Sequence, residues 1–145
     1  MTQNKNLLSV RDLGVRFGSK QVVQGVSFEM AVGEKLALVG ESGSGKSMTG
    51  RAILDLIPHP GVVSADRMRF RGQDLTAMDK GARRKLRGRH ISMVMQDPKF
   101  SLNPVETVGS QIAEAYRIHR KAGVREARER SLAMLEQVQI REPAR

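Results

Sequence analysis

The chain has 145 residues, a length that suits one domain able to bury roughly 68 to 70% of its unfolded surface. It contains no cysteine, which excludes disulfides, thiolate metal sites and thiol nucleophiles. The net charge is +10, and residues 66 to 90 hold nine arginines or lysines against three aspartates. No apolar run approaches the roughly 18 residues of a membrane span and no leader pattern opens the chain, so we expect a soluble cytoplasmic protein.

The first thirty residues alternate apolar and polar side chains with a period of two, which predicts antiparallel strands. A turn is expected near Gly18 and a second break at Gly25. The apolar residues of these runs are Leu13, Val15, Phe17, Val26, Phe28 and Met30.

A continuous apolar run, Leu36–Val39, comes next and predicts a strand buried on both faces, as in a parallel sheet. A glycine-rich segment, 40–47, follows it directly. The apolar spacing then changes to three and four residues, which predicts a helix ended by Pro58, Pro60 and Gly61. The apolar residues of this helix are Met48, Ala52, Ile53, Leu56 and Ile57.

Five further elements are expected. Residues 67–71 alternate arginine with apolar residues, which predicts a half-exposed strand ending at Gly72. A short helix with a cationic outer face follows, and its charged side chains are expected to be solvated, among them Arg83, Lys85 and Arg87. Residues 91–95 predict another buried strand, and two helices are expected from about 108 to near 123 and from about 124 to 139.

The segment 40–47 reads Gly-Glu-Ser-Gly-Ser-Gly-Lys-Ser, a complete phosphate-loop pattern between a predicted strand and a predicted helix. Its glycines let the backbone approach phosphate oxygens closely, and the helix N-terminus attracts anions. Lys46 supplies a charge for the β and γ phosphates, and the Ser47 hydroxyl can bind Mg²⁺. A chance match is expected about once in a hundred chains of this length. We therefore predict that the triphosphate of ATP binds at Gly40, Glu41, Ser42, Gly43, Ser44, Gly45, Lys46 and Ser47.

Residues on both sides of this loop resemble the nucleotide-binding subunit of ABC transporters, over nearly the whole chain. The matching segments, in order, are 7–17, Val26-Ser27-Phe28, Gly33-Glu34, 40–47, Gly72-Gln73-Asp74-Leu75 and Gln96-Asp97-Pro98 with Ser101-Leu102-Asn103-Pro104. The stretch from Met95 to Pro104 is similar to the branch that serves dipeptide, oligopeptide and nickel importers. The resemblance implies an α/β fold, the N-terminal portion of a phosphate-loop ATPase, with an antiparallel β subdomain, a parallel core sheet and helices.

The resemblance also implies roles for single residues. Phe17 matches the aromatic that stacks on adenine, although strand alternation alone would make it an ordinary core residue. Gln96 matches the glutamine that contacts Mg²⁺ and the attacking water, so Ser47 and Gln96 are the implied magnesium ligands. The implied parts are antiparallel strands over about 7–30, the phosphate loop and helix over about 36–57, the glutamine loop over about 96–104, and the start of a helical subdomain over about 107–140.

Three catalytic segments of the family do not occur among these residues: the Leu-Ser-Gly-Gly-Gln signature, a strand ending in Asp-Glu, and a switch histidine after Gln96. We therefore expect a truncated nucleotide-binding domain that binds ATP without turning it over. The implied partners are membrane-spanning permease subunits, a second ATP-binding subunit and, indirectly, a solute-binding protein. The implied location is the cytoplasmic side of the cell membrane.

Two other classes compete with this interpretation. A small kinase or GTPase is one, but a GTPase would need a guanine-selecting Asn-Lys-x-Asp, which the sequence lacks. A basic nucleic-acid-binding module is the other, but stacking aromatics are scarce and only Phe70 lies in the basic stretch, so no specific nucleic acid is expected. His59, His90 and His119 are isolated from other candidate ligands, which argues against a metal site.

Overall fold

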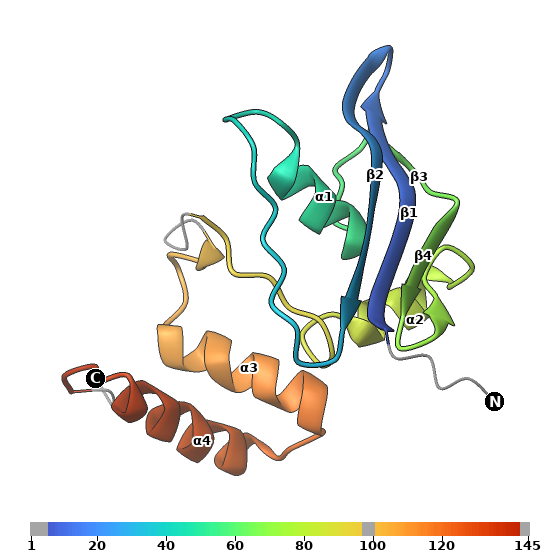
Figure 1. Ribbon diagram of the computed structural model, residues 1–145. Coiled ribbons are helices and arrows are strands. Elements are labelled where there is room, and N and C mark those ends of the chain that lie inside the picture. Colours follow the sequence, from blue (N-terminus) through green and yellow to red (C-terminus); the bar gives the residue numbers. More distant parts are fainter. Residues whose placement is uncertain (1–5, 97–100, 143–145) are drawn as a thin grey trace. The chain divides into compact units, whose positions relative to one another are not determined.

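The computed structural model describes residues 6–96 and 101–142. Asp97 and Pro98, which carry part of the family resemblance, lie outside the described residues. The chain separates into two compact units, residues 1–87 and residues 88–145, and each is described by itself (Figure 1).

An antiparallel sheet forms the first unit. Strands β1 (Asn6–Phe17) and β2 (Lys20–Ala31) make a long hairpin (Figure 1) whose turn contains Gly18 at φ 57°. β1 also pairs with β3 (Val62–Ser64) and β4 (Arg67–Phe70), and β4 pairs with β5 (Gln73–Asp74), always antiparallel. The order is β2-β1-β4-β5, with β3 also on β1. The break expected at Gly25 is an irregularity inside β2 rather than its end.

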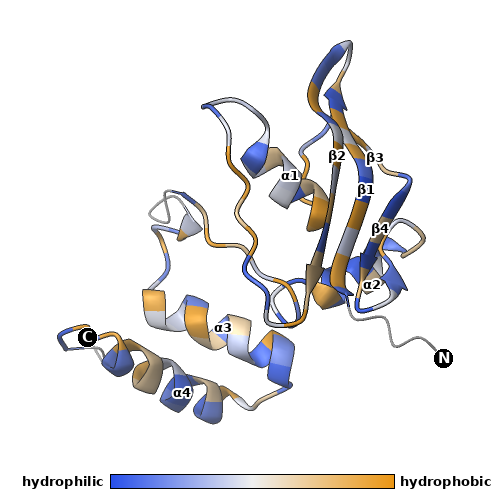
Figure 2. Ribbon diagram, viewed as in Figure 1, coloured by the Kyte–Doolittle hydropathy of each residue, from blue (hydrophilic) through white to orange (hydrophobic). Residues whose placement is uncertain are grey.

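One face of this sheet is the core of the unit. Leu13 and Val15 of β1 are fully buried, and Met68 and Phe70 of β4 are almost so, while Arg67 and Arg69 of β4 are exposed. Figure 2 shows this alternation of hydropathy along β1 and β4. Burial of apolar surface stabilises by about 25 cal/mol per Å², so this face holds the sheet together. The antiparallel strands and the α/β class predicted from the sequence are confirmed.

Helix α1 (Lys46–Ile53) packs on β1 and β2 through its buried residues Thr49 and Ala52. The sequence pattern extended this helix to Ile57, which is wrong. Asp55 adopts a left-handed φ of 58°, and the N–H of Leu56 donates to the carbonyl of Arg51 at 2.8 Å. This is a Schellman-type closure, which satisfies the last carbonyls and turns the chain out of the helix.

Helix α2 (Lys80–Leu86) begins at Asp79, whose carboxylate accepts a hydrogen bond from the N–H of Ala82 at 2.8 Å. The expectation that Arg83 is solvated is wrong, because this side chain is 7% exposed. Its guanidinium donates to the carbonyls of Leu75 at 3.0 Å, Ile53 at 3.3 Å and Ala52 at 3.4 Å. A guanidinium carries five donors, so it can bind the carbonyl of Leu75 together with two carbonyls at the end of α1.

The second unit contains helices α3 (Val108–Arg120) and α4 (Val124–Gln137), which pack side by side (Figure 1). Thr107 caps α3 by accepting from the N–H of Ser110 at 3.1 Å. The two helices meet where the buried Ser131 hydroxyl donates to the carbonyl of Gly109 at 2.8 Å. Both helices match the predicted ones closely. Among the described residues, no helix has the length and apolarity that a membrane crossing requires.

Two predicted strands do not form. Leu36–Val39 belongs to no strand and is exposed, with Val39 at 93%, and residues 92–95 are likewise outside any strand, with Val94 at 89%. Figure 2 shows the apolar stretch in the connection between β2 and α1. A strand buried on both faces needs neighbouring strands and covering layers, and the strand pairs of the described residues are all antiparallel. The parallel part of the expected sheet is therefore absent from the described residues.

Candidate functional site

The glycine-rich segment 40–45 forms the loop that leads into α1 (Figure 1). Gly43 has φ 80° and Gly45, the N-cap of α1, has φ 91°. Both values lie in the left-handed region, which side chains with a Cβ rarely adopt. The loop therefore needs glycine at these two positions for its backbone path.

Gly45 is also needed for packing. A Cβ at this position would lie 2.7 Å from the carbonyl oxygen of Val22 and 3.0 Å from the Cγ2 of Val23, both on β2. A Cβ on Gly40 would lie 2.7 Å from the Ser44 hydroxyl, inside the loop itself. The missing side chains thus let the loop fold tightly and let the beginning of α1 press against the sheet.

Lys46 places its charge over the loop. Its ammonium donates to the carbonyls of Glu41 at 2.6 Å and Gly40 at 2.7 Å, and to the Ser44 hydroxyl at 3.3 Å. The N–H of Ser44 donates in turn to the carbonyl of Glu41 at 3.2 Å. These contacts fold the loop around one positive charge.

The N-terminus of α1 adds further donors. The N–H of Thr49 donates to the carbonyl of Gly45 at 2.8 Å, which is the first hydrogen bond of the helix. The N–H groups of Lys46, Ser47 and Met48 come before it and have no acceptor within the helix. No acidic residue stands in this first turn, and Ser47 is exposed there. The helix dipole and the Lys46 ammonium therefore favour an anion at the same place.

Phe17 is the last residue of β1 and is neither fully buried, like Leu13 and Val15, nor exposed. The tip of its ring lies against Gly61, in the segment that connects α1 to β3. A Cβ on Gly61 would lie 2.7 Å from ring atom Cε1 and 2.8 Å from Cζ. The partial exposure is compatible with either a stacking surface or a packing role.

Gln96, the implied magnesium ligand, is exposed and lies in the second unit. The phosphate loop lies in the first unit, and each of these two parts of the predicted site is described within its own unit. Sequence reasoning missed Gln111, whose amide oxygen accepts from the N–H of Asn103 at 2.9 Å and whose amide nitrogen donates to the carbonyl of Asn103 at 3.0 Å. The family segment 101–104 is thereby fixed to α3, and no sequence signal indicated this.

Sequence reasoning also missed the contacts between α2 and the end of α1. Besides Arg83, Arg87 donates to the carbonyl of Leu54 at 3.0 Å and forms an ion pair with Asp55 at 3.4 Å. Burial in this place lowers the pKa of the Arg83 guanidinium from its ordinary value, and the Asp55 carboxylate opposes the shift. The available signal was the spacing of four residues between Arg83 and Arg87, which puts both on one helix face.

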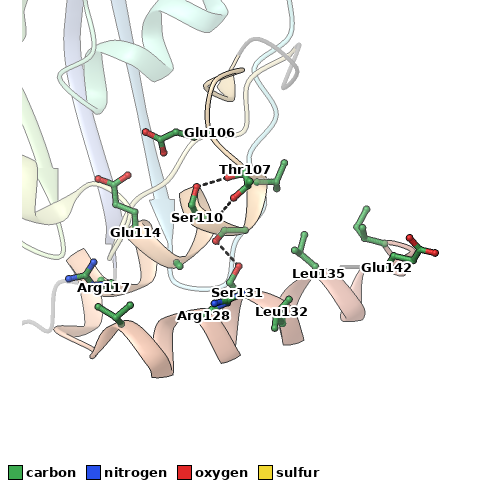
Figure 3. A pocket seen from close by; sticks show the side chains of 15 residues that line it. Glu106, Thr107, Ser110, Glu114, Arg117, Arg128, Ser131, Leu132, Leu135 and Glu142 are labelled. Atoms are coloured by element: carbon green, nitrogen blue, oxygen red, sulfur yellow. Dashed lines mark hydrogen bonds between the residues drawn. The ribbon is translucent and has the colours of Figure 1, made fainter. Parts of the chain in front are cut away.

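A cavity of about 820 Å³ forms a groove between α3 and α4 (Figure 3). Its wall combines aliphatic residues such as Leu132 and Leu135 with charged Glu114, Arg117 and Arg128. None of the predicted phosphate-binding residues lines it. Among the described residues there is also no group of three or more His, Cys, Asp or Glu side chains that could hold a metal.

The chain is similar in sequence to a known family and to several known proteins. A sequence model described as "ABC transporter" matches residues 23–144. The dipeptide transport ATP-binding protein of Haemophilus influenzae is 44% identical over 141 residues, covering 94% of this chain and 43% of that protein. The peptidoglycan transport ATP-binding protein of Agrobacterium fabrum is 46% identical, over 98% of this chain and 27% of that protein.

The oligopeptide transport ATP-binding protein of Bacillus subtilis is 42% identical over 148 residues, covering 99% of this chain and 41% of that protein. The chain therefore spans less than half the length of each of these relatives.

Proposed function

Because this chain belongs to the ABC transporter family, we propose that it is part of an ATP-binding subunit that drives the import of peptides or a related small solute such as nickel. Relatives named as dipeptide, oligopeptide and glutathione import ATP-binding proteins, at 42 to 44% identity, support the peptide assignment. Fold alone would support no such statement, because a phosphate loop serves many reactions.

The observation that carries the proposal is that the Lys46 ammonium and the N–H groups at the N-terminus of α1 adjoin one loop, whose tight path depends on glycine at positions 43 and 45. A triphosphate needs many donors in a small volume, and this arrangement provides them. Residues 40–47 would hold the phosphates, and Phe17 would stack on adenine.

Ser47 and Gln96 would hold Mg²⁺, and the donor types, a hydroxyl and an amide oxygen, suit this hard cation. When bound, the metal neutralises charge on the phosphate oxygens.

We also propose that the 145 residues alone bind ATP without hydrolysing it, because they contain neither the family's signature segment nor its strand ending in Asp-Glu. Gln96 can orient water, but an amide does not accept a proton as a carboxylate does. In the complete protein, the partners would be permease subunits, a second ATP-binding subunit and, indirectly, a solute-binding protein, at the cytoplasmic side of the membrane.

Calorimetric titration with Mg-ATP tests the proposal. Lys46→Ala is expected to remove most of the binding, because backbone N–H groups alone do not replace the charge on the β and γ phosphates. Lys35→Ala, which changes an exposed lysine outside the loop, is the matched control and is expected to bind as the unchanged chain does. Equal affinity of the unchanged chain and Lys46→Ala would refute the phosphate-loop assignment, and phosphate release that Lys46→Ala abolishes would refute the absence of hydrolysis.

A further inference from the structure

Gly61 is the residue that the Phe17 ring touches, and its backbone does not explain why it is glycine. Several glycines of the first unit have φ in the left-handed region, but Gly61 does not. What excludes a side chain at Gly61 is space. A Cβ would lie 2.7 Å from Cε1 and 2.8 Å from Cζ of Phe17, and it would also meet the Cγ2 of Ile57.

The sheet register fixes this contact. β3 pairs with β1 so that Arg16 lies opposite Val62 and Val15 opposite Val63. Continuing this antiparallel register by one step puts Phe17 opposite Gly61. The backbone of Phe17 is paired with Lys20 in the hairpin, which holds it in the sheet. If the space at Gly61 is filled, the Phe17 ring and the Ile57 side chain are the groups that must shift.

We propose that Gly61 is a positioning residue for the adenine contact of Phe17, an inference that rests on the proposed ATP-binding function. With no side chain at 61, the tip of the ring lies against the backbone and the side chain keeps one orientation. A methyl group at 61 conflicts with the tip of the ring and turns the ring away. Stacking is then weakened, because it requires the base and the ring to lie face to face. Gly61 contacts the ring and not the phosphates, so it acts on the base alone.

The contrary interpretation is that Phe17 simply covers a glycine across the strands, a packing arrangement known in β-sheets. The two interpretations differ in what a substitution does to different ligands. Loss of packing alone leaves the affinity for ATP unchanged or lowers the affinities for ATP and inorganic triphosphate together. Loss of ring position lowers the affinity for ATP only.

The test measures Mg-ATP and inorganic triphosphate binding by calorimetry for Phe17→Ala, Gly61→Ala and the double variant. Stacking worth about 1 to 3 kcal/mol corresponds to a loss of about 5- to 150-fold in ATP affinity for Phe17→Ala. Gly61→Ala is expected to lose at least about threefold in ATP affinity, but no more than Phe17→Ala loses, and to bind triphosphate unchanged. In the Phe17→Ala background, Gly61→Ala is expected to add nothing.

Gly123→Ala is the matched control, because a Cβ at Gly123 meets nothing within 4 Å and its φ of −67° suits alanine. If Gly61→Ala does not fold, Gly61→Ala with Ile57→Leu removes the Ile57 Cγ2 and leaves the conflict with Phe17 alone. The same loss for ATP only is then expected.

The outcomes separate the inference from the function it rests on. If Phe17→Ala leaves ATP affinity unchanged, adenine stacking is wrong and the inference is lost with it. If Phe17→Ala weakens ATP binding but Gly61→Ala does not, or if Gly61→Ala weakens ATP and triphosphate equally, the role of Gly61 alone is wrong.

Discussion

The β1–β2 hairpin buries its apolar residues, whereas the apolar segment Leu36–Val39, only a short way farther along the chain, exposes them. Leu13 on β1 is 0% exposed, and Val39 is 93% exposed. The hairpin has a partner strand across a two-residue turn, so each strand supplies the other's hydrogen bonds. Segment 36–39 has no partner strand among the described residues.

Apolar character alone therefore does not make a strand. Antiparallel neighbours are joined by a tight turn, but parallel neighbours need a crossover of a dozen residues or more. A strand of a parallel sheet therefore depends on parts of the chain that are distant in sequence, because neighbouring residues cannot supply the hydrogen-bond partners of its backbone N–H and C=O groups. Three substitutions test this contrast between the packed parts of the first unit and the exposed segment 36–39, from the largest expected effect to the smallest.

Leu13→Ala is expected to lower the free energy of unfolding by about 2–5 kcal/mol, because it leaves a cavity in the buried face of the sheet. Urea denaturation monitored by circular dichroism measures the free energy of unfolding. Ser9→Ala, at a half-buried residue of the same strand that lies opposite the exposed Arg69, is the comparison substitution and is expected to cost far less. A loss for Leu13→Ala below that of Ser9→Ala would mean that the sheet is not the stable part of the chain.

Arg83→Met is expected to cost about 1–3 kcal/mol, because the carbonyls of Leu75, Ile53 and Ala52 lose a buried donor. The control is Arg84→Met on the exposed side of α2, for which we expect a change within about 0.5 kcal/mol. The same denaturation measurement applies. Equal effects of the two substitutions would show that α2 does not hold the end of α1.

Leu38→Ala is expected to change the free energy of unfolding by less than about 0.5 kcal/mol, since its side chain is 43% exposed and lies outside every strand. It is the direct counterpart of Leu13→Ala, with the same atoms removed. If both substitutions cost the same, segment 36–39 is packed in solution and the contrast between the two regions is wrong.

Local patterns predicted the parts that depend on local contacts. The hairpin, β4 and the helices α3 and α4 followed from periodicity, and the loop before α1 followed from its motif. The end of α1 was missed because Asp55 takes a left-handed φ that aspartate rarely adopts, and nothing in its neighbours signals it. Arg83 was assigned to solvent because a charge run usually is solvated, whereas two of its acceptors, the carbonyls of Ala52 and Ile53, lie on α1, 31 and 30 residues away in sequence.

The predicted site divides in the same way. Residues 40–47 are contiguous, so their geometry follows from one motif and one helix. Gln96 is remote in sequence and lies in the other unit, so its role still depends on the family resemblance. For Phe17 the sequence left a core residue and a stacking surface as alternatives, and the contact with Gly61 turns that choice into an experiment.

The contacts of Lys46 have a consequence for any measured affinity. Its ammonium already has acceptors within the chain, the carbonyls of Gly40 and Glu41. A phosphate oxygen that takes this ammonium competes with those carbonyls, so binding exchanges one set of acceptors for another. The observed affinity is then the difference between two sets of hydrogen bonds. A substitution that weakens the internal set without touching Lys46 would therefore tighten phosphate binding.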